Sequence, residues 1–194
     1  MNVYDFDNTI YDGDCSIDFF LFCLKKHPQV VVYLPSQIFA LIKYKLCIFS
    51  KLKFKEEFFS FLQSLNLPEN DVKTFWNTNQ YKIKSWYLNQ KKDDDLIISA
   101  SPDFLLNEIC NRMNISNLIA SEVDIKTGKF KSNNCYGREK RRRFEEKYPD
   151  DIIDKFYSDS ESDHYLAHIA VKAFIVKGNN IEDWDDRRKL NNGD

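Results

Sequence analysis

Five short runs of apolar residues are spread along the chain, and each has the length of a buried strand. They cover residues 2–6, 96–98, 118–120, 155–157 and 173–176. Continuous apolar runs of this kind are typical of strands that are covered on both faces, as in a parallel sheet. The pattern therefore predicts a sheet whose strands come from widely separated parts of the chain.

Helical patterns separate most of these runs. Residues 102–113 form one of them, with Ser101 as a suitable N-cap before Pro102, and residues 160–172 form another. Strands that alternate with helices predict an α/β fold with a Rossmann-like, doubly wound sheet. Residues 122–130 alternate apolar and polar positions around a Thr-Gly pair, which predicts a small β-hairpin.

One connection is much longer than a crossover between parallel strands requires. Ninety-four positions separate Asp5 from Ser99, and a loop of that length without its own structure would be unusual in a compact domain. We therefore expect a core domain of residues 1–14 and 93–194, with a helical cap domain of residues 15–92 inserted after the first strand. Helical patterns within this insertion, most of them bounded by prolines, cover residues 16–27, 36–49, 50–65 and 68–90.

The expected cap is rich in phenylalanine. Packing between helices is the simpler explanation, and an apolar substrate pocket is the alternative. The residues concerned are Phe19, Phe20, Phe22, Phe39, Phe58, Phe59 and Phe61.

Composition favours a folded domain with a charged surface. The chain has 194 residues, of which 43% are hydrophobic and 30% charged, with a formal net charge of −2. Because this bulk charge is small, we expect no nucleic-acid or membrane partner. The longest apolar stretch, residues 30–49, is interrupted by Pro35, Lys43 and Lys45, which argues against stable membrane insertion.

The cysteines indicate a cytoplasmic protein. There are five, and no two of them form a C-x-x-C pair. Scattered single thiols of this kind are typical of reduced residues, rather than of a disulfide framework or a zinc site.

The first candidate for chemistry is a pair of carboxylates at the end of the first strand. Asp5 and Asp7 are two positions apart, so their side chains point to the same side of an extended chain. Ligands of open α/β sheets bind beyond the carboxyl ends of the strands, where this pair lies. Two carboxylates at one point repel each other unless a cation or a proton lies between them, and Mg²⁺ is a suitable cation.

Three more segments supply polar groups after other strands. Ser99 ends an apolar run just before a helix, where a hydroxyl and free backbone N–H groups can hold a phosphate oxygen. Lys140 provides a positive charge, although its basic neighbours could equally indicate a solvated helix face. Asp159 and Asp163 follow a late strand, and Asp163 could also be the acidic member of a capping box.

The order of these segments resembles the haloacid dehalogenase superfamily. The chain contains Asp-x-Asp-x-Thr at residues 5–9, a strand-ending serine, a lysine in Gly-x-x-Lys at 137–140, and Asp-x-x-x-Asp at 159–163. Any one of these motifs would be weak evidence, whereas four in this order with a cap-sized gap are specific. The sequences around Ser99, Lys140 and Asp159 are most similar to the phosphoserine-phosphatase-like branch.

The resemblance implies a role for each residue in a phosphatase that acts on a small-molecule phosphate monoester. Asp5 would be the nucleophile that forms an aspartyl-phosphate, and Asp7 the general acid and base. The cofactor would be Mg²⁺, bound by Asp5, the backbone carbonyl of Asp7, and Asp159. The phosphoryl oxygens would contact Ser99, Ala100 and Lys140, with Asp163 in a supporting role.

Two alternatives remain at this point. The same superfamily contains phosphotransferases, which sequence separates poorly from phosphatases. A phospho-accepting regulatory domain also uses an aspartate cluster, a hydroxyl and a lysine, but it has no need of an acid such as Asp7 or of an inserted cap. The oligomeric state is not indicated by the sequence.

The chain departs from phosphoserine phosphatases at the positions that hold the substrate's amino acid. Asp14 is near the acidic position expected for the amino group, but there is no arginine before Arg112 to bind the carboxylate. Lysines at 51, 53 and 55 cannot make the planar, two-pronged contact of an arginine. We therefore expect phosphoserine to be a poor substrate, and the preferred ester to lack an α-carboxylate.

Overall fold

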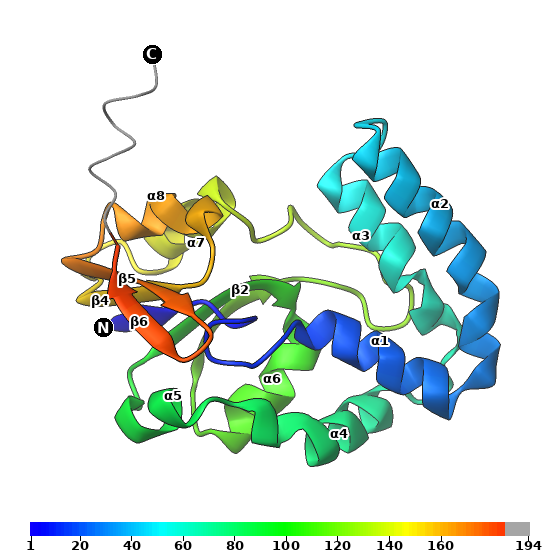
Figure 1. The fold of residues 1–194 in the computed structure, drawn as a ribbon, viewed down its shortest axis with the longest axis horizontal. Helices are drawn as coiled ribbons and strands as arrows, with labels where there is room; N and C mark the ends of the chain where they lie inside the picture. Colours follow the sequence, from blue (N-terminus) through cyan, green and yellow to red (C-terminus); the bar gives the residue numbers. More distant parts are fainter. Residues whose placement is uncertain (185–194) are drawn as a thin grey trace.

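The computed structural model describes residues 1–184; residues 185–194, the end of the expected 93–194 segment, lie outside the described residues. One six-stranded sheet forms the centre of the molecule (Figure 1). Its strands are β1 (Asn2–Tyr4), β2 (Leu96–Pro102), β3 (Asn117–Ser121), β4 (Lys155–Ser158), β5 (Lys172–Lys177) and β6 (Asn180–Asp183).

The order of the strands in the sheet is β3-β2-β1-β4-β5-β6. All neighbours are parallel except β5 and β6, which pair antiparallel at one edge. The predicted doubly wound α/β sheet is therefore confirmed, and all five apolar runs are strands. The sequence pattern did not predict β6, because its residues are exposed and form no apolar run.

Helices flank the sheet and also form a separate group beyond it (Figure 1). The α-helices are α1 (Cys15–Lys26), α2 (Leu34–Lys45), α3 (Lys51–Phe59), α4 (Pro68–Asn79), α5 (Ser85–Gln90), α6 (Asp103–Arg112), α7 (Arg138–Lys147) and α8 (His164–Ala167). Short 3-10 helices are η1 (Pro28–Tyr33), η2 (Ser60–Ser64), η3 (Gln80–Lys82) and η4 (Glu161–Asp163). In residues 1–184, no helix is both long and apolar enough to cross a membrane.

Alternate residues of the buried strands enter two separate cores, one on each face of the sheet. Tyr4 and Tyr157 belong to the core that includes residues of α4, α5 and α6, whereas Val3 and Phe156 pack with residues of α7 and α8. The rings of Tyr4 and Tyr157 stack with centroids 4.8 Å apart, and Tyr157 stacks on Phe174 at the same distance. This row of rings joins three neighbouring strands on one face, which fixes their register.

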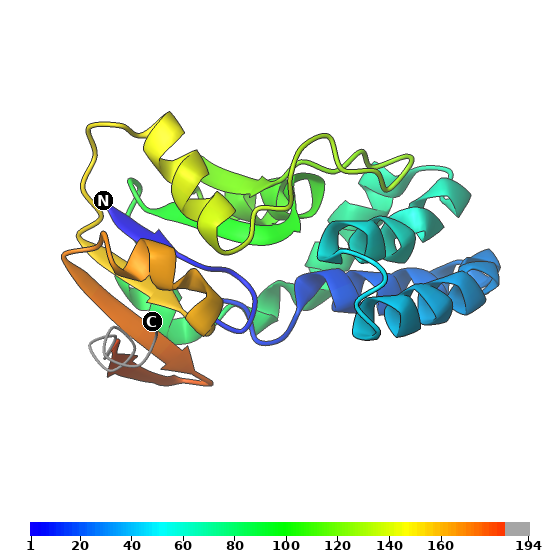
Figure 2. The ribbon, with the colours of Figure 1, turned by 90° about the horizontal axis from the view of Figure 1, so that it is seen from above.

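The helices of residues 15–92 make two kinds of contact. The indole of Trp76 in α4 donates a hydrogen bond to the carbonyl of Leu105 in α6 and packs edge-on against Phe6, so α4 covers the sheet. By contrast, α2 and α3 lie at the end of the molecule far from β4, β5 and β6 (Figure 2). The insertion therefore both covers the core and extends beyond it.

A loop of the core contacts this extension. Phe59 packs on Phe130, and the side chain of Gln63 donates to the carbonyl of Thr127. Gly128, with a φ of +74°, lies so close that a Cβ would be 2.3 Å from the carbonyl oxygen of Phe59. Only glycine fits this contact without a shift of the backbone. The predicted hairpin in this loop consists of a single antiparallel bridge, between Val123 and Phe130.

Two details of the predicted helices are wrong. Ser101 does not cap α6; it lies within β2, and Pro102 occupies the N-cap position. The helix expected over residues 160–172 is limited to η4 and α8, because β5 already begins at Lys172.

Candidate active site

The carboxyl ends of β1, β2 and β4 meet at one edge of the sheet, where the predicted residues come together. Tyr4 pairs with Tyr157 and with Ile97, so the residues that follow these positions are level with one another. Asp5 is therefore level with Ile98 and Ser158, and Ser99 and Asp159 each follow one residue further along the neighbouring strands. Parallel strands produce this arrangement without any further constraint.

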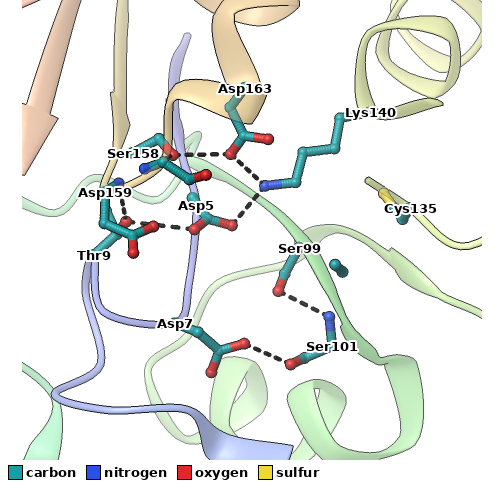
Figure 3. Close-up of polar contacts among 12 residues, drawn as sticks. Asp5, Asp7, Thr9, Ser99, Ser101, Cys135, Lys140, Ser158, Asp159 and Asp163 are labelled. Atoms are coloured by element: carbon teal, nitrogen blue, oxygen red, sulfur yellow. Dashed lines mark hydrogen bonds and ion pairs between the residues drawn. The ribbon is translucent and has the colours of Figure 1, made fainter. Parts of the chain in front are cut away.

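Lys140 in α7 lies between two of the carboxylates (Figure 3). Its Nζ is 2.6 Å from Oδ1 of Asp5 and 2.6 Å from Oδ2 of Asp163. All three side chains are almost completely buried. Gly137, with a φ of +57°, precedes the first turn of α7 and lets the chain turn so that Lys140 points toward the sheet.

The negative charge of this cluster exceeds the positive charge. Burial raises the pKa of Asp5, and the charges of Asp163 and Asp159 add to the increase, whereas Lys140 opposes it. Burial alone would lower the pKa of Lys140, but Asp163 and Asp5 raise it above its ordinary value. The ammonium is therefore charged, but this single positive charge does not offset the effect of burial on the pKa of Asp5.

Asp7 occupies a separate position on the other side of the pocket (Figure 3). Its Oδ1 accepts a hydrogen bond of 2.7 Å from the backbone N–H of Cys15, and its Oδ2 accepts one of 2.5 Å from the hydroxyl of Ser101. Burial raises the pKa of Asp7 to about 6, with a further contribution from Asp14. A carboxyl group with this pKa can both donate and accept a proton near neutral pH.

Thr9 connects the first motif to the last. Its hydroxyl donates to Oδ2 of Asp5 at 3.4 Å and accepts from the backbone N–H of Asp159 at 2.9 Å. The chain reaches this position through Asn8, whose φ is +56° and whose carbonyl accepts from Lys84. Thr9 thus fixes the loops after β1 and β4 relative to each other.

All of the predicted site residues line one pocket of about 300 Å³. They are Asp5, Asp7, Asp14, Ser99, Ala100, Lys140, Asp159 and Asp163. The side chain of Asp14 also caps helix α1, since it accepts hydrogen bonds from the N–H groups of Ser16 and Ile17. The capping-box alternative for Asp163 is wrong, since its side chain contacts Lys140 and the hydroxyl of Ser158. The solvated-face interpretation of Lys140 is also wrong.

The other wall of the pocket comes from the helical insertion. Apolar side chains of Ile17, Phe54, Phe58 and Phe59 line it, together with Lys51 and Lys55. Lys55 donates to the carbonyl of Ala100 at 2.8 Å and to the side chain of Asn134 at 3.0 Å. Lys51 lies over the ring of Tyr136, 3.1 Å from its centroid. The insertion therefore contacts the core directly at the pocket.

Two polar residues of the site were not predicted. The spacing of Ser99 and Ser101 indicates that both point to the same side of β2, and this two-residue period was a usable signal for Ser101. No comparable signal exists for Lys55, because its contact with Ala100 depends on how the insertion packs on the core.

The donor set is suitable for a magnesium ion. Asp5 and Asp159 lie within hydrogen-bond distance of each other, and burial raises the pKa of Asp159. In addition, Oδ1 of Asp163 is buried without a hydrogen-bond partner among the described residues. No three acidic, histidine or cysteine side chains within residues 1–184 form a complete ligand set. A magnesium ion at this site would therefore need backbone, substrate or water oxygens to complete its coordination.

Comparisons with known proteins agree with the geometry. A model of the haloacid dehalogenase-like hydrolase family matches residues 3–168. No match was found among curated proteins. A solved protein of unknown function from Bordetella pertussis Tohama I has a TM-score of 0.74 at 15% identity, covering 89% of this chain and 87% of that one.

Two further solved structures share the fold. One is a phosphoserine phosphohydrolase-like protein from Francisella tularensis subsp. tularensis SCHU S4, with a TM-score of 0.52 at 20% identity and coverage of 89% of this chain and 86% of that chain. The other is a phospho-aspartyl intermediate analogue of phosphoserine phosphatase, with a TM-score of 0.55 at 15% identity and coverage of 88% and 83%. The arrangement of helices and strands thus belongs to a known fold.

The hydroxyl of Thr9 generates the first prediction. Thr9→Val keeps the shape of the side chain but leaves the N–H of Asp159 without its acceptor, so we expect unfolding to become easier by about 1–3 kcal/mol. Thr9→Ser is the matched control, because it keeps the hydroxyl. Urea unfolding of the three proteins measures the difference, and equal stabilities of the valine and serine variants would contradict the role given to this hydroxyl.

Proposed function

The chain belongs to the haloacid dehalogenase-like hydrolase family, and from this premise we propose that it is a magnesium-dependent phosphatase that hydrolyses a small-molecule phosphate monoester through a phosphorylated Asp5. The main support is the placement of Asp5 and Asp7 in one pocket. Asp5 contacts a buried lysine, whereas Asp7 is held 2.5 Å from the hydroxyl of Ser101. Burial raises the pKa of both carboxyl groups, and Lys140 opposes the increase at Asp5. These two environments suit a nucleophile and an acid, respectively.

In the first step, a carboxylate oxygen of Asp5 attacks the phosphorus and forms an acyl-phosphate bond while the ester P–O bond breaks. The leaving oxygen takes the proton of Asp7. In the second step, Asp7 accepts a proton from water as that water attacks the phosphorus, the bond to Asp5 breaks, and inorganic phosphate is released. Both carboxyl groups return to their starting states.

The need to offset the negative charge of the phosphate accounts for the roles of the other pocket residues. An anionic nucleophile approaches an anionic phosphate only if the repulsion between them is reduced. Lys140 supplies one positive charge beside Asp5, while Ser99 and the backbone at Ala100 are placed to donate to phosphoryl oxygens. Magnesium, bound by Asp5, Asp159 and the backbone carbonyl of Asp7, would supply the further positive charge that the transferring group requires.

We also propose that residues 15–92 act as the cap of this site, with residues 1–14 and 93–194 as the core. Pocket residues from α1 and α3 support this division, since Ile17, Phe54 and Phe58 are on the insertion and face the catalytic carboxylates across the cavity. Closure of such a cap would exclude water during the first step and admit it for the second.

The need for a divalent cation is the second prediction. Turnover of a phosphate monoester should be lost when a chelator removes magnesium and should return when the ion is added back, because Lys140 alone cannot neutralise Asp5, Asp159 and the substrate. The assay is phosphate release from a panel of monoesters. Full activity in excess chelator would contradict the proposal, and transfer of phosphate to added alcohols rather than to water would indicate a phosphotransferase.

The third prediction concerns the two carboxylates. Asp5→Asn should abolish turnover and leave the fold intact, since the amide has nearly the same shape but is not nucleophilic. Asp7→Asn should reduce kcat by roughly a hundredfold or more. Asp12→Asn is the matched control, because Asp12 is an exposed residue of the same loop that does not line the pocket. Near-normal turnover of the Asp5 variant would place the nucleophile elsewhere.

The pocket also indicates the class of leaving group. No arginine lines it within the described part of the chain. Arg112 is occupied elsewhere, by Glu108, Gln80 and the carbonyl of Lys73. Lys55 is already bonded to the core through Ala100 and Asn134. The wall that faces the leaving group is formed largely by phenylalanine, and so favours an apolar group over an amino acid.

The fourth prediction follows from that wall. Phosphoserine should be a poor substrate, and kcat/KM should be higher for esters of more apolar alcohols without an α-carboxylate. Phe54→Ala should lower kcat/KM for the apolar esters by about tenfold, with little effect on glycerol phosphate. The measurement is kcat/KM across phosphoserine and esters of sugars, alcohols and nucleosides. If phosphoserine were the best substrate by about tenfold, the argument from the missing arginine would be wrong.

A further inference from the structure

Helix α2 has its polar and apolar faces reversed. A helix on the surface of a folded domain normally buries its apolar side chains and exposes its polar ones. In α2 the buried residues are Gln37 and Ala40. Gln37 compensates for its burial by donating to the carbonyl of Phe58. Leu34 at the start of the helix packs against the core, but the larger apolar residues from Ile38 to Ile42 are exposed.

These residues form an outward-facing stripe. Ile38, Ile42 and Leu46 are four positions apart and so lie on one face of the helix axis, and each is between 50% and 65% exposed. Phe39 and Leu41 lie at the margins of the stripe. Adjoining exposed residues extend the surface before and after the helix, and we call the whole set the α2 face: Val31, Val32, Ile38, Phe39, Leu41, Ile42, Leu46 and Ile48.

The segment around α2 is basic in sequence, and two of its lysines, Lys43 and Lys45, lie on α2 itself. Residues 19–55 contain seven lysines and no aspartate or glutamate. Elsewhere in the segment, Lys26 pairs with Asp71, Lys53 pairs with Glu57, and Lys51 and Lys55 line the active-site pocket. Because the whole chain has a net charge of −2, the remainder of the sequence carries −9. The small bulk charge that argued against a membrane partner is thus the sum of a basic segment and an acidic remainder.

The lysines of α2 are placed at the borders of the apolar stripe. Lys43 lies over the rings of Phe39 and Phe49, with its Nζ 4.4 and 4.8 Å from their centroids, and Lys45 is exposed. A lysine that lays its alkyl chain on aromatic rings keeps its ammonium at the edge of an apolar surface. This arrangement is found in helices that lie in the interface of a bilayer.

Both views place α2 at the end of the molecule opposite β5 and β6 (Figures 1 and 2). Helix α3 lies between α2 and the active-site pocket, and Tyr44 of α2 stacks on Phe54 of α3 with centroids 5.2 Å apart. The α2 face is therefore free of the residues assigned to catalysis, and a flat surface can approach it from outside.

We propose that the α2 face docks on the surface of an anionic lipid bilayer, with its apolar side chains at the boundary of headgroups and acyl chains and its lysines beside lipid phosphates. Contiguous exposed apolar surface of this kind marks an interaction site, and Lys43 and Lys45 at its borders favour an anionic partner. A second copy in a symmetric dimer would place lysines opposite lysines, whereas anionic headgroups match them.

The test is flotation of the purified full chain with lipid vesicles, one set of phosphatidylcholine alone and one with added phosphatidylglycerol. The chain should float with the anionic vesicles and much less with the neutral ones. Ile38→Ser with Ile42→Ser should weaken binding by roughly tenfold or more, since each loses an apolar side chain that enters the interface. Lys43→Gln with Lys45→Gln should weaken it by a similar factor and reduce its salt dependence.

A matched control is Ile152→Ser with Val171→Ser. It removes two exposed apolar side chains from the part of the chain that contains the sheet, far from α2 in sequence. This variant should bind vesicles as the unchanged chain does. Urea unfolding midpoints show that each variant is folded, without reference to any activity. Absence of binding to anionic vesicles would overturn the proposal, as would a dimer that dissociates in the Ile38 and Ile42 variant, because a second copy would then cover the face.

Discussion

Lys140 lies between Asp5 and Asp163, and its contact with both is the interaction on which the site depends. A buried ion pair contributes little net stability, but removal of the lysine would leave both buried carboxylates without their cationic partner, which costs about 3–5 kcal/mol. Loss of Asp5 alone would leave Lys140 paired with Asp163. Here the lysine connects α7 to the loops after β1 and β4. The same contact that places the helix therefore also places a positive charge where a phosphate would bind.

The pairing of strands β1 and β4 positions the carboxylate of Asp5 that contacts Lys140. Parallel pairing places Asp159 one residue beyond the level of Asp5, and Thr9 fixes their loops with two hydrogen bonds. The stacked rings of Tyr4 and Tyr157 restrict sliding of the same two strands. A shift of one residue would reverse which side chains face the pocket. The register of the strands thus determines both the packing of the core and the positions of the carboxylates.

Much of this arrangement could be predicted from the sequence because it depends on local periods and on strand ends. Asp5, Ser99 and Asp159 follow apolar runs, and parallel strands bring such positions together. Ser101 was misassigned because Ser-Pro before a helix also fits a cap, and only the tertiary contact with Asp7 distinguishes the two. The exposure of Ile38 and Ile42 could not be foreseen, since an apolar residue in a helical pattern is ordinarily buried.

The proposed substrate class and the proposed docking surface share one structural element, the antiparallel pair α2 and α3. Phe54 of α3 connects the two regions, because it lines the pocket and also stacks on Tyr44 of α2. A helix that exposes isoleucine to water loses the stabilisation that burial would give, about 1.5–3 kcal/mol for each side chain. Catalysis on a freely diffusing polar ester would give no compensation for that loss. An ester with an apolar leaving group, by contrast, concentrates at a bilayer surface, where the α2 face would place the enzyme.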